Sequence, residues 1–206
     1  MTPEENKEKP TSDFLAMVII QQKNSSIAVG EIKNALHERG FGILMAIAAI
    51  PICLPIPAPP GYTTLFSLPL FIFSLQMIFG MHAPWLPEWL ERKSIEKTIL
   101  EKMLIKADPW LKKIEKYMKP RLTYIAASTW ERFIGIFAFV FAISIAIPLP
   151  LTNFLPGLGI LIMSLGLVNR DGLTILSGML VGTVGIGVAM TFLLILWLGI
   201  SMPEFF

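Results

Sequence analysis

The chain has 206 residues, of which 54% are hydrophobic and 16% are charged, and its formal net charge is +2. The charged residues leave three long uncharged blocks, residues 41–81, 133–169 and 172–203. A membrane-spanning helix needs about 20 consecutive apolar residues, so the blocks predict an α-helical membrane protein and exclude an ordinary soluble domain.

Residues 1–40 predict a cytoplasmic or interfacial segment that is too polar to cross a membrane. The first 13 residues are acidic and polar, and no short apolar stretch with a small-residue cleavage site follows, so a cleaved signal peptide is not expected. A helix is expected near Val29 to Arg39, with Ser25 and Ser26 as candidate N-cap residues.

The first uncharged block, residues 41–81, predicts two helices separated by a proline-rich break. A helix from Phe41 to Leu54 would rise only about 21 Å, less than a hydrocarbon core of about 30 Å. Prolines at 51, 55, 57, 59 and 60 prevent that helix from continuing. The run from Tyr62 to Met81 is long enough to span, with a kink expected at Pro69. Cys53 reads as a packing residue.

Residues 82–132 form a basic linker, with eleven Lys and Arg against seven Asp and Glu. By the positive-inside tendency this segment should be cytoplasmic. Apolar residues at helical spacing predict two amphipathic helices at the membrane surface, one in 87–106 and one in 109–119. The polar face of the second helix carries four lysines suited to anionic lipid headgroups, Lys112, Lys113, Lys116 and Lys119. Its apolar face argues against nucleic acid as the partner.

The second uncharged block, residues 133–169, has the same design as the first. Residues 38–57 align without gaps to 131–150 at a constant offset of 93, with nine identities in twenty positions. The identities include both charges of each Glu-Arg pair, one glycine and both prolines of each P-x-P break. We interpret this as an internal duplication.

The predicted fold is therefore an all-α polytopic membrane protein with two repeated, proline-broken hairpins. Both hairpins should enter from the same side and be either re-entrant or barely spanning. Non-helical backbone at membrane depth must be enclosed by protein or reached by water, so the two breaks should meet inside the protein. Residues 172–203 hold the one unambiguous spanning helix, which starts at Gly172. Its small-xxx-small pair, Gly178 and Gly182, predicts close helix contact and is compatible with a homodimer.

The two breaks are the best candidate for a functional site, because broken helices in transporters expose backbone groups to a solute. A plain hairpin turn is the competing interpretation. The residues assigned to a solute path are Pro55, Pro57, Tyr62, Thr63, Thr64, Pro148, Pro150, Thr152 and Asn153. A second group of charged residues reads either as a gate or as interface anchors: Glu38, Arg39, Glu131, Arg132, Arg170 and Asp171.

Catalytic chemistry is not indicated. No ionisable residue lies within the uncharged blocks, which disfavours proton coupling. His37 and His82 lack partners at metal-ligand spacing, and no nucleotide-binding or hydrolase motif occurs. We therefore expect no metal, no cofactor and no enzymatic activity.

Several features together resemble the ExoD family of bacterial membrane proteins, named for exopolysaccharide synthesis. They are, in chain order, residues 29–42, the proline-rich break, the run 68–75, Gly80 followed by Pro84-Trp85-Leu86-Pro87, Pro109-Trp110-Leu111, Pro148-Leu149-Pro150 and Arg170-Asp171-Gly172. The resemblance implies an inner-membrane location and a link to exopolysaccharide production, but no catalytic residues.

Two functions follow as hypotheses. One is passage of a polar or lipid-linked solute at the breaks. The other is a non-transporting scaffold for the polysaccharide synthesis or export machinery.

Overall fold

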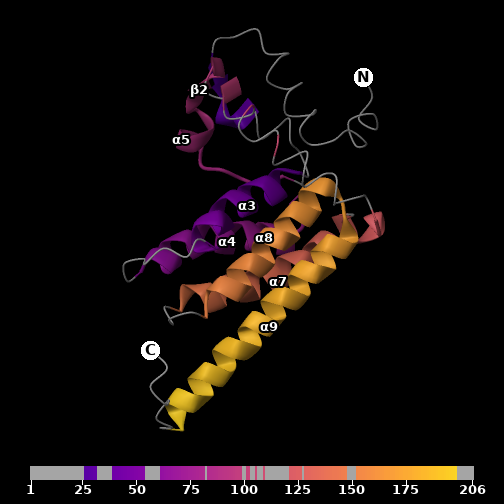
Figure 1. Cartoon of the computed structure of the whole chain (residues 1–206). Coiled ribbons are helices and arrows are strands. Elements are labelled where there is room, and N and C mark those ends of the chain that lie inside the picture. The colour runs from indigo at the N-terminus through magenta and orange to yellow at the C-terminus, as the bar shows by residue number, and fades with distance from the viewer. Residues whose placement is uncertain are drawn as a thin grey trace.

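The computed structural model describes residues 26–31, 39–53, 61–81, 83–98, 101, 102, 105, 109, 121–126, 128–147 and 152–198. Its body consists of five long helices packed side by side (Figure 1). They are α3 (Arg39–Cys53), α4 (Tyr62–Ile78), α7 (Ser128–Ala146), α8 (Phe154–Asn169) and α9 (Gly172–Trp197). The prediction of a helical fold is confirmed.

The boundaries of the first two helices follow from proline and glycine. α3 contains Pro51 in its last turn and ends at Cys53, close to the end expected from the sequence. Gly61, with φ of 88°, precedes α4, and this left-handed conformation has a low cost only for glycine. α4 ends at Ile78, three residues before the expected end, and its 17 residues would rise about 25 Å.

The first helix of each hairpin packs mainly against the second helix of the other hairpin. α3 lies along α8, and α4 lies along α7. One glycine in the first half of each of α3 and α7 permits the close approach. A Cβ on Gly42 would lie 2.8 Å from the Ser164 carbonyl oxygen in α8, and one on Gly135 would lie 3.0 Å from the Ser74 carbonyl oxygen in α4. The paired helices are antiparallel, so both breaks lie at the same end of the bundle.

α4 and α8 end in the same way. Gly80 follows α4 and Arg170 follows α8, and both have a left-handed backbone conformation, with φ of 74° and 53°. The Met81 N–H donates to the Gln76 carbonyl at 3.0 Å, and the Asp171 N–H donates to the Gly166 carbonyl at 2.9 Å. Each helix thus closes in a Schellman motif, which satisfies carbonyls that the helix itself leaves unpaired.

α9 packs along α8 and continues past the breaks. Gly178 faces Met163 and the Gly159 carbonyl in α8, while Gly182 faces Gly159 and the ring of Phe141 in α7. Further along, Gly185 contacts Leu155 and Pro156 in the first turn of α8. The remaining turns of α9 extend beyond the other helices, as Figure 1 shows.

A short antiparallel ribbon stands apart from the five helices. β1 (Ser26–Ala28) pairs with β2 (Ser94–Glu96), with Ile27 opposite Ile95, and the four-residue α5 (Glu88–Glu91) precedes β2. Two expectations are corrected here. Ser26 lies in a strand and is not an N-cap, and a continuous amphipathic helix across 87–106 is wrong because the chain turns at Arg92 and pairs with β1. Burial of Ile27 against the protein outweighs local helix propensity.

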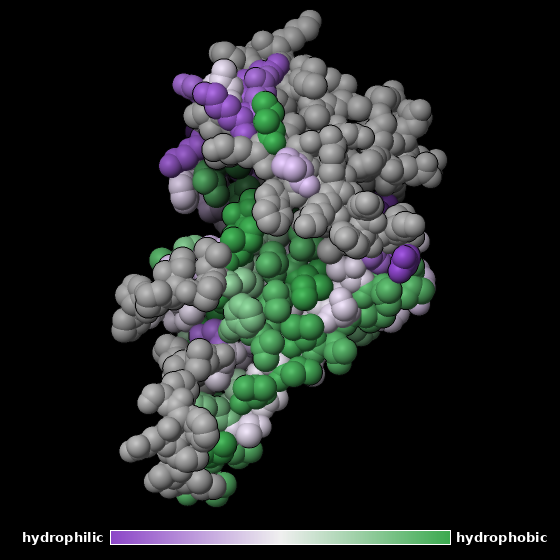
Figure 2. Space-filling view, viewed as in Figure 1, coloured by the Kyte–Doolittle hydropathy of each residue, from purple (hydrophilic) through white to green (hydrophobic). Residues whose placement is uncertain are grey.

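The buried faces of the five helices form one apolar core that includes Phe41, Met45, Leu70, Phe141 and Ile160. Large apolar side chains also cover much of the outside, and Figure 2 shows hydrophobic surface across the helical body. α9 is the one helix of the described chain that is long and apolar enough to cross a membrane; α3, α4 and α8 are apolar but shorter.

Candidate functional site at the helix breaks

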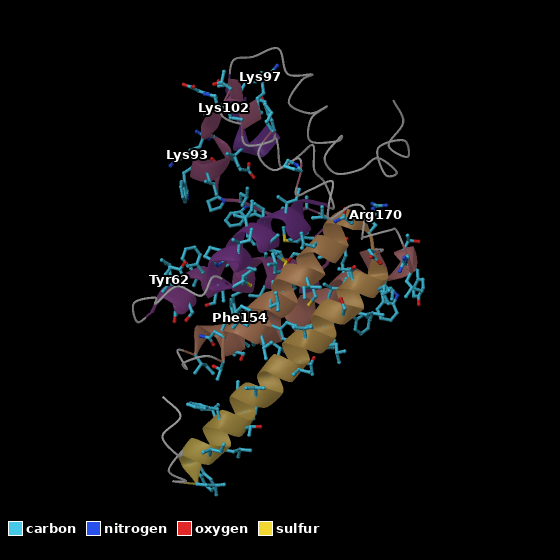
Figure 3. All side chains as sticks on the ribbon, in the orientation of Figure 1. Tyr62, Lys93, Lys97, Lys102, Phe154 and Arg170 are labelled. Carbon is cyan, nitrogen blue, oxygen red and sulfur yellow. The ribbon has the colours of Figure 1, made fainter. Side chains whose placement is uncertain are left out.

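Five polar residues assigned to the solute path gather at one end of the helical body. Tyr62, Thr63 and Thr64 form the first turn of α4, and Thr152 and Asn153 immediately precede α8. Figure 3 shows Tyr62 and Phe154 at this end, whereas Arg170 lies at the opposite one. The pairing of α3 with α8 and of α4 with α7 brings the two breaks together.

A direct hydrogen bond joins the two breaks. The Asn153 side-chain Nδ2 donates to Thr63 Oγ1 at 3.2 Å, across 90 residues of sequence. Asn153 is only 7% exposed, and a buried polar group left without its partner costs about 1–3 kcal/mol. The Thr152 hydroxyl lies 3.5 Å from Asn153 Oδ1, which places a third polar group in the same cluster.

The other two hydroxyls contact carbonyls at helix C-termini. The Thr64 hydroxyl donates to the Ala146 carbonyl at the end of α7, at 3.1 Å, and the Tyr62 hydroxyl lies 3.5 Å from the Pro51 carbonyl at the end of α3. The last four carbonyls of a helix have no partner within it. Part of the polar cluster therefore has a structural role in capping α3 and α7.

The starts of α4 and α8 lie in the same cluster without a side-chain cap. Neither Gly61 nor Asn153, the residues at the two N-cap positions, makes a side-chain hydrogen bond to its helix. The first N–H groups of a helix carry partial positive charge. The site thus combines hydroxyl and amide groups with two helix N-termini, which are suited to a neutral polar or anionic group.

Four prolines were assigned to the solute path and lie outside the described residues, namely Pro55, Pro57, Pro148 and Pro150. So do Glu38 and the four lysines Lys112, Lys113, Lys116 and Lys119. Arg39 begins α3, but its side chain is likewise outside the described part. Among the described residues, no group of three His, Cys, Asp or Glu side chains could hold a metal ion.

The remaining charged candidates lie at the end of the helices opposite to the breaks. Glu131 is buried, at 6% exposed, in the first turn of α7, and the Arg132 guanidinium lies over Gly80 at the end of α4. Arg170 ends α8. Asp171 caps α9 through a 3.1 Å bond from the Leu173 N–H and a 2.7 Å bond from the Thr174 hydroxyl.

Gly178 and Gly182 make the close helix contact expected from their spacing, but they do so within the chain. Both glycines are enclosed by α8 and α7. A homodimer would therefore require a different surface.

Sequence reasoning missed a polar contact that fixes the segment after α4. The buried Gln76 amide accepts from the Trp85 N–H at 2.7 Å and donates to the Trp85 carbonyl at 3.2 Å. Gln76 is the one side-chain amide in the 41–81 block. A lone glutamine in a long apolar run was the available signal, because such a group needs a polar partner.

Comparison with known proteins places this helical body in a family. The family model described as "Exopolysaccharide synthesis, ExoD" matches residues 11–191. An uncharacterised protein of Synechocystis sp. is 36% identical over 172 residues, covering 82% of this chain and 80% of the relative. Protein ExoD of Rhizobium meliloti is 30% identical over 177 residues, covering 84% and 73%. The chain belongs to the ExoD family, which is associated with exopolysaccharide synthesis. No solved structure matches it.

Proposed function

We propose that this chain is an inner-membrane protein that passes a polar or lipid-linked solute during exopolysaccharide synthesis or export. In this proposal α9 crosses the bilayer, and the two hairpins α3–α4 and α7–α8 enter it from the cytoplasmic side as copies of one duplicated unit. The observation that carries the proposal is the Asn153–Thr63 hydrogen bond, which joins the two breaks in one polar cluster.

Duplication is supported by equivalent contacts in the two hairpins. Gly42 and Gly135, which align at the offset of 93, make equivalent contacts with the serines of α8 and α4. At an offset of 90, Gly80 and Met81 in the α4 ending correspond to Arg170 and Asp171 in the α8 ending. Thr63 and Asn153 also correspond at that offset. The bond that joins them therefore lies where two equivalent units would meet.

The position of the breaks along α9 supports a re-entrant arrangement. Gly185 contacts the first turn of α8, about 20 Å of helix rise after Gly172, and about 18 Å of α9 follows it to Trp197. If α9 spans the bilayer from Gly172, the breaks lie within the hydrocarbon core of about 30 Å. Non-helical backbone is tolerated at that depth where protein encloses it or water reaches it.

Polysaccharide output tests the polar cluster. The double substitution Thr63→Val and Asn153→Leu removes the cross-break bond and both groups with which a solute would form hydrogen bonds. Loss of two bonds to the solute, each of about 0.5–1.5 kcal/mol, corresponds to a loss of output of about fivefold to 100-fold. The measurement is exopolysaccharide secreted by a strain whose own family member is deleted and replaced by each variant. Thr183→Val is the matched control, because the Thr183 hydroxyl bonds only within its own exposed helix turn.

The breaks themselves are tested by replacing Pro55, Pro57, Pro148 and Pro150 with alanine. At normal expression, we expect polysaccharide output to be abolished, since α3 and α7 could then extend into the breaks and displace the polar cluster. Unchanged output in both this variant and the Thr63/Asn153 variant would refute a role for the breaks.

The alternative is a scaffold that docks a polysaccharide synthase without transporting anything. It is favoured by the segment held by Gln76, which presents the exposed side chains of Trp85 and Trp89. Purified protein in liposomes separates the two functions. A carrier gives flux of labelled sugar or lipid-linked sugar that the Thr63/Asn153 variant loses, whereas a scaffold gives no flux.

A further inference from the structure

An aromatic cluster lies at the end of the helical body opposite to the breaks. Tyr124 in the 3-10 helix η1 (Thr123–Ala126) lies 6.4 Å from Trp130 in α7, and Trp130 lies 5.4 Å from Phe133, between ring centroids. All three side chains are exposed. The rings meet edge-on or tilted, at interplanar angles of 68° and 45°. Exposed aromatic rings that contact one another form an apolar surface, so this cluster requires an explanation beyond core packing.

The exposed face of α7 changes character along its length. Its first turns present Trp130, Arg132 and Phe133. After these, every exposed side chain on that face is apolar, namely Ile136, Phe137, Val140, Ile143 and Ile147. The neighbouring α9 shows a parallel band from its first turn, with Leu173, Leu176, Leu180 and Val184 exposed. An aromatic and basic rim that borders an apolar band is typical of a membrane–water interface.

Among the described residues, the exposed charge at this rim is positive. The acidic residues of the described stretch 152–198 and of α7 are Asp171 and Glu131, and both are buried, at 3% and 6% exposed. Arg121 and Arg132 are exposed. The Arg121 carbonyl accepts from the Gly172 N–H at 2.7 Å, which fixes that residue beside the start of α9. Figure 2 shows a hydrophilic patch at the right-hand edge, directly beside the hydrophobic surface of the helices.

We propose that Arg121, Tyr124, Trp130, Arg132 and Phe133 form an interfacial belt that binds the headgroups of an anionic phospholipid bilayer. The two guanidinium groups contact lipid phosphates, and the aromatic rings lie at the level of the headgroups. Trp197, which is 82% exposed, lies about 38 Å of helix rise beyond Gly172. This spacing matches a hydrocarbon core with part of each interface. The inference rests on the proposed membrane location and is independent of any solute at the breaks.

A protein partner is the competing occupant of this surface. The lipid bilayer is favoured because the belt continues without interruption into the exposed apolar bands of α7 and α9. A protein interface would instead be a bounded patch surrounded by a polar rim.

Lipid titration of the purified full-length chain tests the charge of the belt. Phosphatidylglycerol is added to protein in neutral detergent, and the midpoint of the rise in Tm gives the apparent affinity. Each basic residue at an anionic surface contributes roughly fivefold, so Arg121→Gln with Arg132→Gln should weaken binding by about 25-fold. Arg92→Gln is the matched control, since Arg92 is an exposed arginine paired with Glu88 outside the belt.

The depth of the rings is measured separately, with Trp130 as the one tryptophan and the other four replaced by phenylalanine. In vesicles of phosphatidylcholine and phosphatidylglycerol, bromine carried near the headgroup should quench Trp130 more strongly than bromine deep in the chains. Equal titration midpoints for the double variant and the wild type would overturn the proposal. So would a Tm rise of the same size with inorganic phosphate, or stronger quenching from deep bromine. Loss of polysaccharide output in the Thr63/Asn153 variant is unaffected by any of these results.

Discussion

Asn153 and Thr63 are the residues on which the proposed function depends, and they differ from their polar neighbours. Tyr62 and Thr64 contact carbonyls at the ends of α3 and α7, so their hydroxyls have a sufficient structural explanation. The Asn153–Thr63 bond caps no helix and joins two breaks that are far apart in sequence. A hydrogen bond in this position can be exchanged for one to a solute at little net cost.

Asp171 provides a test of the structural interpretation at the opposite end. Asp171→Ala removes both acceptors of the α9 N-cap, which should lower stability by about 1 kcal/mol and Tm by about 2–4 °C. Asp171→Asn should retain most of the stability, because asparagine also caps helices. The measurement is the temperature at which the detergent-solubilised protein loses its monodisperse peak. A wild-type Tm for the alanine variant would contradict the assigned cap.

At the scale of helices, glycine determines how closely α9 approaches its neighbours. Gly159, Gly178 and Gly182 allow the backbones of α8 and α9 to touch, and Gly182 also admits the ring of Phe141. Small residues stabilise helix pairs in membranes by permitting such contact. Gly187, in contrast, lies on the exposed side of α9, and no atom outside its own stretch of helix is within 4 Å of its Cβ position.

This contrast predicts opposite results for one substitution at two positions of one helix. Gly182→Val places a branched side chain into the Phe141 ring and should destabilise the protein by at least about 1–3 kcal/mol. Gly187→Val should leave Tm within about 1 °C of the wild type, since an exposed substitution away from packed contacts changes stability little. Comparable losses of Tm for both variants would show that the α8–α9 interface is not as described.

At the scale of the whole molecule, the pairing of α3 with α8 and of α4 with α7 determines which residues lie at each end of the bundle. Both breaks lie at one end of the helices. Arg132, which contacts Gly80 after α4, lies at the other end, as does Arg170, which Figure 3 labels. The proposed topology therefore places those arginines at the cytoplasmic surface, the breaks within the bilayer, and the end of α9 on the opposite side.

Cysteine labelling tests this arrangement in a Cys53→Ser background. Arg132→Cys and Arg170→Cys should react with a membrane-impermeant maleimide in inverted vesicles, and Trp197→Cys should react in intact spheroplasts. Tyr62→Cys and Asn153→Cys should share one accessibility pattern, because their residues meet in one cluster. Labelling of positions 62 and 153 from opposite sides would contradict the same-side arrangement of the hairpins.

The amino-acid sequence by itself determined the helices and their interruptions. Helix formation and interruption depend on neighbouring residues, so they can be predicted from the sequence. The features used were the uncharged blocks, the five prolines between residues 51 and 60, and the glycines at the starts of α4 and α9. Membership of the ExoD family could also be inferred from the sequence alone, because it rests on short motifs that follow one another in chain order. The ribbon was not readable, because Ile27 and Ile95 lie far apart in sequence and their pairing overrides the helical pattern of residues 87–106.

Only the tertiary structure decided which helices are partners. The sequence placed polar residues at each break and predicted that the two breaks meet inside the protein, but it did not predict which helices pair to bring them together. The pairing of α3 with α8 and of α4 with α7 depends on the fit of Gly42 and Gly135 against serine carbonyls in the other hairpin. That fit is a contact between surfaces far apart in the chain, and it is what brings Asn153 to Thr63.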